Sequence, residues 1–265
     1  MSVPRVRRLH VSAAALVSTL LAVAFAAGEI APADRRSSFA DMSPDSQAMQ
    51  RDDTANPGML TVLEGENLWK QRAGAADRSC ADCHHDAAVT MRGVAVRHPA
   101  YNAVLERPIT LKERINLCRT EQQNATPLKW ESPQLLALTT FVAHKSRGLP
   151  IAVAENEQTR PFIERGRRIF EQRQGQLNLS CAACHDDNWG GRLAGNPIPQ
   201  GHPTGYPLYR LEWQSIGSLQ RRLRGCLTGV RAEPYEYGSP EFVNLELYLM
   251  SRAKGLPLET PAVRP

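Results

Sequence analysis

Hydrophobic positions along the chain recur mostly at three- and four-residue intervals, the period of an α-helix that buries one face. This spacing predicts helices over residues 59–72 and 161–172, and shorter ones over residues 111–118 and 219–227. No segment shows the sustained two-residue alternation of a half-buried strand. The pattern therefore predicts an all-α protein.

Two further helices are predicted from the residues at their ends. Ser132-Pro133 and Ser239-Pro240 each place a serine at an N-cap and a proline in the first helical turn. The apolar segments that follow lead to Gly148 and Gly255, and glycine commonly ends a helix. We expect these two helices to end at the glycines.

The same landmarks occur twice in the same order. Gly65 and Gly166 each lie 15 residues before the first cysteine of a Cys-x-x-Cys-His group. An Arg-x-x-x-Cys motif follows in each half, and the Ser-Pro pair and the glycine come after it. Because so many landmarks match in order, we predict two tandem domains related by an internal repeat, each of ordinary domain size.

The first residues are typical of an export signal. Three arginines precede an apolar run over residues 11–27, and Ala24-Phe25-Ala26 fits a small-x-small cleavage site. The run is shorter than the about 20 residues that a membrane-spanning helix needs, which favours a cleaved signal peptide over an uncleaved anchor. We therefore expect a periplasmic protein with no transmembrane segment in the mature chain.

Charge adds one exclusion. The formal net charge of the 265-residue chain is +5, and removal of the three arginines of the signal peptide would leave +2. A mature chain so close to neutral argues against nucleic-acid binding.

The two Cys-x-x-Cys-His groups carry the candidate chemistry. A c-type haem needs two thiols that add to its vinyl groups and an imidazole that ligates its iron, and this motif supplies all three. A Cys₄ zinc site would not need a histidine after both pairs, and a dithiol redox motif would need a βαβ context. We predict two covalent c-type haems, at Cys80–Cys83–His84 and Cys181–Cys184–His185, with the histidines as iron ligands.

Two cysteines remain, Cys118 and Cys226, and they occupy matching positions in the two halves. A thiolate is a strong anionic ligand for ferric iron, so we predict that each supplies the second axial ligand of its haem. The alternative is a disulfide between the two domains. Methionine is the usual second ligand in small cytochromes c, but Met250 falls inside the final amphipathic helix, where we expect a core residue.

Arg114 and Arg222 each precede their cysteine by four residues, which places arginine and cysteine on one helical face. A guanidinium there would favour the thiolate form and could also bind an anion. For Arg222 the alternative is a surface arginine on a basic helix, since Arg221 and Arg224 flank it.

The predicted fold is thus all-α, with two tandem cytochrome c-like domains. The polar segment before them is expected to be extended or partly helical. The predicted parts are a signal peptide (1–26), a lead-in (27–57), a first cytochrome c domain (58–153), a linker (154–160) and a second cytochrome c domain (161–265).

These residues also carry a resemblance. The chain resembles the SoxA family, a subunit of the SoxAX cytochromes of the periplasmic sulfur-oxidising (Sox) system. The stretches most similar to that family are residues 178–186, 209–226 and 229–235, with residues 114–119 in the first half.

The resemblance implies a partner, a substrate and a reaction. It implies a complex with the smaller cytochrome SoxX, and an L-cysteine S-thiosulfotransferase activity that joins thiosulfate to a cysteine of the carrier protein SoxYZ. Cysteine S-thiosulfonate forms, and two electrons leave through the haems. The resemblance also implies that the second haem is the active-site haem. It implies that Cys226, whose counterpart in the family is found as a persulfide, is catalytic, and that Arg222 is the catalytic and substrate-binding arginine.

Two other functions remain open from the residues. A dihaem chain can be an electron carrier without catalytic activity of its own, although a carrier has no need of a cationic anion site beside a thiolate ligand. A dihaem peroxidase would need an open or displaceable iron position, which two cysteine ligands argue against.

Overall fold

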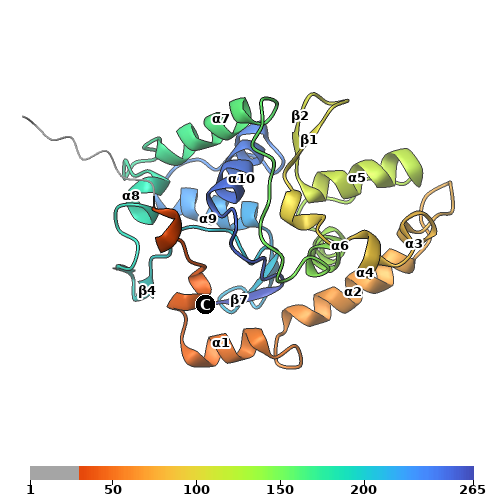
Figure 1. Ribbon diagram of the computed structural model, residues 1–265, viewed down its shortest axis with the longest axis horizontal. Coiled ribbons are helices and arrows are strands. Elements are labelled where there is room, and N and C mark those ends of the chain that lie inside the picture. Colours follow the sequence, from red (N-terminus) through yellow and green to blue (C-terminus); the bar gives the residue numbers. More distant parts are fainter. Residues whose placement is uncertain (1–29) are drawn as a thin grey trace, which may run out of the picture.

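The computed structural model describes residues 30–265, so the predicted signal peptide (1–26) lies outside the described part of the chain. The described chain forms two helical lobes side by side, one for each half of the repeat (Figure 1). Helices dominate both lobes, which confirms the predicted all-α class. Between residues 30 and 265, no helix is long and apolar enough to cross a membrane.

Each half has the same order of elements. A long helix comes first, then a very short helix with the Cys-x-x-Cys-His group, a hairpin, the helix with the lone cysteine, and a closing helix. The first half contains α2 (Gly58–Lys70), α3 (Cys80–His84), α4 (Ala87–Thr90), β1 (Ala100–Asn102), β2 (Arg107–Ile109), α5 (Leu111–Gln122) and α6 (Pro133–His144). The second contains α7 (Arg160–Glu171), α8 (Cys181–His185), β3 (Arg192–Leu193), β4 (Asn196–Pro197), β5 (Leu208–Arg210), β6 (Ser215–Gly217), α9 (Leu219–Gly229), α10 (Pro240–Arg252) and β7 (Ala262–Arg264).

The first and last helices of each half cross at a glycine. α2 packs on α6, and α7 packs on α10. A Cβ atom at Gly65 would lie 2.2 Å from the carbonyl oxygen of Ala137, and one at Gly166 would lie 2.1 Å from that of Asn244. Neither helix pair could approach so closely with a side chain there, which explains why both repeats place glycine at this position.

The hydrophobic pattern did not predict the short strands. β1 pairs antiparallel with β2 in the first half, and β5 pairs antiparallel with β6 in the second. β7, at the C-terminus, adds to β5 as a parallel strand. With two or three residues each, these strands are too short to show a recognisable alternation.

The closing helices end earlier than predicted. α6 ends at His144 and α10 at Arg252, four and three residues before the expected glycines. Gly148 and Gly255 instead lie in the turns that follow, with φ values of +84° and +88°. Glycine is needed there because other residues rarely adopt a positive φ.

These two glycines also join the halves. The amide of Gly148 donates to the carbonyl of Leu258 over 2.7 Å, and the amide of Gly255 donates to the carbonyl of Ile151 over 2.9 Å. Two further backbone bonds between the same turns run in the opposite directions. The contact is reciprocal, since each half donates two backbone hydrogen bonds to the other and accepts two from it.

The two halves share one hydrophobic core in addition to their own. Ala143 and Ile151 of the first half are buried there with Leu247, Met250 and other residues of the second. Met250 is therefore a core residue, as expected from its helix.

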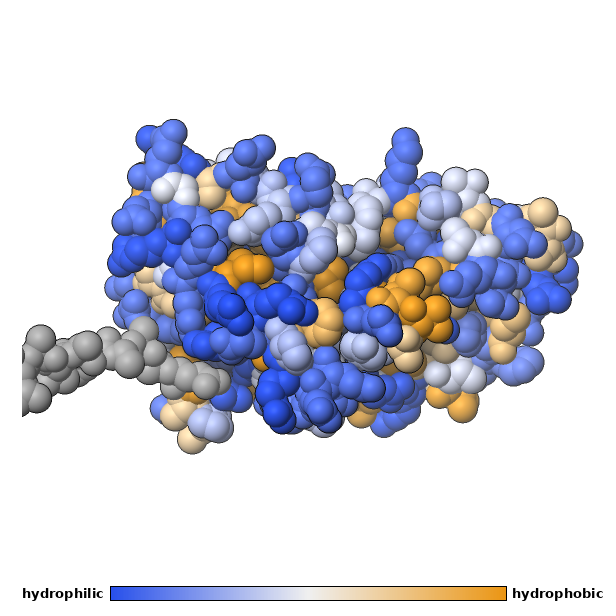
Figure 2. Space-filling model, turned by 90° about the horizontal axis from the view of Figure 1, so that it is seen from above, coloured by the Kyte–Doolittle hydropathy of each residue, from blue (hydrophilic) through white to orange (hydrophobic). Residues whose placement is uncertain are grey.

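The lead-in docks on the second half. Its helix α1 (Pro44–Arg51) lies beneath that lobe, next to the C-terminus (Figure 1). Two short 3₁₀ turns, Pro32–Asp34 and Ser38–Asp41, precede it. The face of the molecule seen from above is mostly hydrophilic, with apolar side chains in separate patches (Figure 2).

Candidate haem sites

Both Cys-x-x-Cys-His groups fold as single short helices, α3 and α8. Ser79 and Ser180 cap them by accepting hydrogen bonds from the backbone amide three residues on. In α3 a capping box completes the cap, since the carboxylate of Asp82 accepts a hydrogen bond from the amide of Ser79. The motif is short and locally capped, so its two thiols and its imidazole are held on one helix.

The helices α5 and α9 bring each lone cysteine to the motif of its own half. Burial, and then the nearby sulfur of Cys118, raise the pKa of Cys80 to about 11. In the second half, burial and then the charge of Cys226 raise the pKa of Cys181 to about 12. All six cysteines lie in the described part of the chain and are free, so no disulfide joins Cys118 to Cys226.

The donor set of the second site fits a c-type haem. Cys181 and Cys184 offer two thiols and His185 an imidazole, and the Nδ1–H of His185 donates to the carbonyl of Pro199 over 2.7 Å. That bond fixes the ring and leaves Nε2 to ligate a metal. Within residues 30–265 no group of three or more His, Cys, Asp or Glu side chains is arranged to hold a metal ion by itself.

The sulfur of Cys226 lies beside His185 and near two arginines, Arg222 and Arg210. Burial pushes the pKa of Cys226 upward, but a hydrogen bond from His185 and the charges of Arg222 and Arg210 outweigh it, so the pKa lies below its ordinary value. The thiolate is therefore more accessible here than in an ordinary cysteine. The structure brings Arg222 and Cys226 together on α9, as their spacing predicts.

The first site differs from the second in charge. Burial raises the pKa of Cys118, and the nearby Arg114 opposes this without reversing it. Burial and then Arg114 lower the pKa of His84, so this arginine also lies close to its motif. The two sites share a plan, but the pKa of the lone cysteine is raised in the first and lowered in the second.

Arg222 has a free guanidinium in the site. It is partly buried, yet it forms no hydrogen bond or ion pair with any described residue. A partly buried, unpaired guanidinium can bind an anion without first breaking an ion pair.

Two residues near Cys226 were missed from the sequence, Arg210 and Tyr206. Arg210 lies at the end of β5, where it donates to Glu212 over 2.7 Å and stacks on Trp213 at 5.4 Å. Burial raises the pKa of Tyr206 to about 12, and the charges of Arg222 and Cys226 also act on it. The first hairpin has Asn102 where the second has Arg210, so the second hairpin contributes a cation that the first does not.

Two of the remaining described histidines are held by backbone carbonyls. His202 is buried and its Nδ1 bonds the carbonyl of Arg36, while His98 bonds the carbonyl of Val94. His144 lies in the interior at the end of α6, and His85 is exposed.

Comparison with known proteins identifies the family. A family model described as the SoxA/TsdA cytochrome c domain matches the chain twice, over residues 64–151 and 165–258. This chain belongs to the SoxA/TsdA family. The two matches coincide with the two halves of the repeat, and cytochrome c membership means that the chain binds covalent c-type haem.

Relatives within the SoxA/TsdA family are similar over most of their length. The chain is 38% identical to the L-cysteine S-thiosulfotransferase subunit SoxA of Pseudaminobacter salicylatoxidans, over 81% of this chain and 76% of that protein. It is 37% identical to the SoxA subunit of Rhodovulum sulfidophilum, over 86% and 80%. The crystal structure of SoxXA from P. pantotrophus superposes with a TM-score of 0.84, at 31% identity over 86% of each chain.

Proposed function

We propose that this chain is the SoxA subunit of an L-cysteine S-thiosulfotransferase. The observation that carries the proposal is the second site, where the half-buried sulfur of Cys226, with a lowered pKa, lies beside His185 and the unpaired Arg222. The sequence similarity to SoxA proteins that bear this activity in their names supports it.

The proposed reaction joins thiosulfate to a cysteine thiol of the carrier SoxYZ. A sulfur–sulfur bond forms between the outer sulfur of thiosulfate and the carrier sulfur, and the S–H bond of the carrier breaks. The products are the cysteine S-thiosulfonate, one proton and two electrons, so atoms and charge balance. The c-type haems supply the electron-accepting chemistry when they are bound, one electron for each iron.

The residues of this chain bind and orient the anion. The sulfonate end of thiosulfate carries negative charge, and the planar guanidinium of Arg222 can pair two of its oxygens at once. Arg210 adds a second positive charge, held in place by Glu212 and Trp213. The outer sulfur is then directed toward Cys226, whose pKa is lowered by a hydrogen bond from His185 and by the same two cations.

The proposal extends to cofactor number, partner and compartment. Two haems are proposed, with Cys80, Cys83, Cys181 and Cys184 as attachment points and His84, Cys118, His185 and Cys226 as axial ligands. Both motifs fold in the same way, which supports equal occupation. SoxX is the proposed subunit partner, since the superposed structure is that of a SoxXA complex. A periplasmic location follows from the chemistry, because c-type haems are attached outside the bacterial cytoplasm.

The test uses the full chain in complex with SoxX. Thiosulfate and SoxYZ are added together and singly, and both cytochrome reduction and the mass of SoxYZ are followed. We expect reduction only with both present, and a carrier mass increased by one thiosulfate. Reduction by thiosulfate without a modified carrier would indicate an electron-transfer protein and overturn the proposal.

A further inference from the structure

A segment of irregular backbone, residues 199–206, borders the second site at both of its ends. At one end Pro199 accepts the Nδ1–H bond of His185, and Gly201 lies so close to the same ring that a Cβ atom would be 3.1 Å from its Cγ. At the other end Tyr206 is buried and lies close enough to Cys226 for the charge of this cysteine, after burial itself, to raise the pKa of the tyrosine. The position of this segment therefore bears on both proposed axial ligands.

The lead-in holds the first part of this segment. Gln200 is only 1% exposed, and both ends of its amide bind lead-in backbone. Its Oε1 accepts from the amide of Arg36 over 2.8 Å, and its Nε2 donates to the carbonyl of Asp34 over 2.9 Å. His202 adds a bond of 2.9 Å to the carbonyl of Arg36. Gln200 and His202 are thus both hydrogen-bonded to the backbone of residues 34–36.

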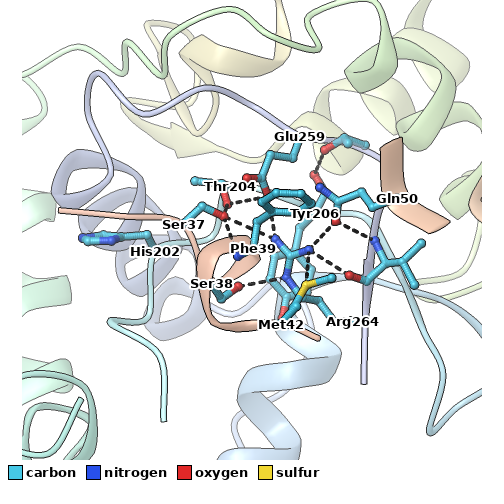
Figure 3. A network of polar contacts seen from close by, with 12 residues as sticks. Ser37, Ser38, Phe39, Met42, Gln50, His202, Thr204, Tyr206, Glu259 and Arg264 are labelled. Atoms are coloured by element: carbon cyan, nitrogen blue, oxygen red, sulfur yellow. Dashed lines mark hydrogen bonds and ion pairs between the residues drawn. The ribbon is translucent and has the colours of Figure 1, made fainter. Parts of the chain in front are cut away.

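A second group of contacts fastens the end of the segment (Figure 3). The hydroxyls of Ser37 and Thr204 lie 3.0 Å apart, and Thr204 donates to Glu259 over 3.1 Å. Arg264 of β7 pairs with Glu259 over 2.5 Å and donates to Ser38 over 2.8 Å. The lead-in, the segment and the C-terminal strand form one polar network.

Loss of the lead-in would leave this network unsatisfied. The amide of Gln200 would lose both partners, and a buried polar group without partners is unfavourable enough to make the backbone around it move. The arrangement is specific to the second half. Every hydrogen bond that residues 36–51 make to another element goes to that half, and the tie of the lead-in to the first half is the exposed pair Asp53–Arg147.

We propose that residues 30–51 of the lead-in are a positioning element that fixes segment 199–206 and so holds His185 and Tyr206 in place around the second haem. The lead-in and β7 both lie outside the residues that match the family model. The inference rests on the proposed function, because it assumes a haem at the second motif.

Gln200→Ala tests the inference in the full chain with SoxX. Electron paramagnetic resonance and midpoint potentials of the ferric protein report on each haem separately, so the first haem is an internal control. We expect the signal of the second haem to broaden or split and its potential to move, with the first haem unchanged. Thiosulfate turnover should fall by roughly 10- to 100-fold, as when catalytic groups are slightly misplaced.

Two other variants keep the test decisive. Asp53→Asn, which breaks the tie of the lead-in to the first half, should leave both haem signals as in the wild type. Ser37→Ala removes one hydroxyl and should shift the signal of the second haem in the same direction as Gln200→Ala, by a smaller amount. It serves as the test if Gln200→Ala fails to fold. Unchanged signals in Gln200→Ala, or equal changes at both haems, would overturn the inference. A wild-type protein with no haem at Cys181 would instead overturn the proposed function.

Discussion

Asp186 and Arg252 form a buried ion pair directly after the second haem motif. Their charged atoms lie 2.5 Å apart, and their side chains are 8% and 3% exposed. Asp186 follows His185 in the chain, and Arg252 is the last residue of α10, where its guanidinium also lies 4.5 Å from the ring centre of Phe170. The pair thus fastens the motif helix to the closing helix of its domain.

Breaking that pair should be strongly destabilising. Arg252→Met leaves the carboxylate of Asp186 buried without its partner, and a buried charge left unpaired typically costs about 3–5 kcal/mol of unfolding free energy. The exposed pair Lys254–Glu155 is a matched control, for which Lys254→Met should cost below about 1 kcal/mol. Denaturant unfolding of the two variants would measure the difference, and equal losses would refute the role of burial.

The two lone cysteines should each account for one spectroscopic signal. If Cys118 and Cys226 ligate the two irons, the ferric protein should show two low-spin, thiolate-type signals by electron paramagnetic resonance. Cys118→Ala should remove one of them and Cys226→Ala the other. A pyridine haemochrome assay should still find two haems in both variants. Spectra that stay unchanged in both would show that other groups ligate the irons.

Arg222 and Arg114 should differ in their effect on turnover. Removing one charged contact to the reacting anion typically costs about 2–4 kcal/mol of transition-state stabilisation, or roughly 10²–10³ in rate. Arg222→Ala should therefore lose most thiosulfate-dependent turnover while it keeps its haems and SoxX, and Arg222→Lys should recover little. Arg114→Ala should be much milder. Equal losses in the two alanine variants would show that the anion site is elsewhere.

Arg210 should act mainly on substrate binding. Its guanidinium is shared with Glu212, so its removal should weaken the anion site less than removal of Arg222. We expect Arg210→Gln to raise the KM for thiosulfate by about tenfold, as for the loss of about 1.4 kcal/mol of binding, with a smaller change in kcat. Steady-state kinetics at fixed SoxYZ would measure both constants. An unchanged KM would remove Arg210 from the site.

The lowered pKa of His144 should make the protein less stable in mild acid. Burial, and then Arg147 and Lys145, lower the pKa of His144 to about 4 from an ordinary value of 6.5. The unfolded chain therefore binds the proton first, and stability is full above pH 6.5 and falls as the pH drops toward 4. Neither ring nitrogen of His144 has a hydrogen-bond partner among the described residues.

Replacing that ring tests the prediction. His144→Leu should flatten the dependence between pH 7 and 4.5 by up to about 3 kcal/mol, because one depressed pKa of this size is worth about that much. His202, whose pKa is also lowered to about 4 by burial, would keep part of the slope. Unfolding midpoints measured across this range would settle the sign. A steeper slope in the variant would contradict it.

The sequence predicts best what depends on near neighbours. Arg222 and Cys226 are four residues apart on one helix, so their common face follows from helical geometry alone. Arg210 and Tyr206 were not predicted, since a hairpin that shows no alternation brings them to the site. The docking of the lead-in was equally hidden, because the bond from Arg36 to Gln200 spans 164 residues of mostly polar sequence.

The reciprocal bonds between the turns at Gly148 and Gly255 bear on the ancestry of the chain. Each turn donates to the other at equivalent positions, which is the pattern of an isologous interface in a two-fold symmetric dimer. Duplication and fusion of the gene for a one-haem subunit that paired with itself would leave this geometry. The two halves now differ, because the second has Arg210 where the first has Asn102 and the second alone receives the lead-in's bonds to Gln200 and His202.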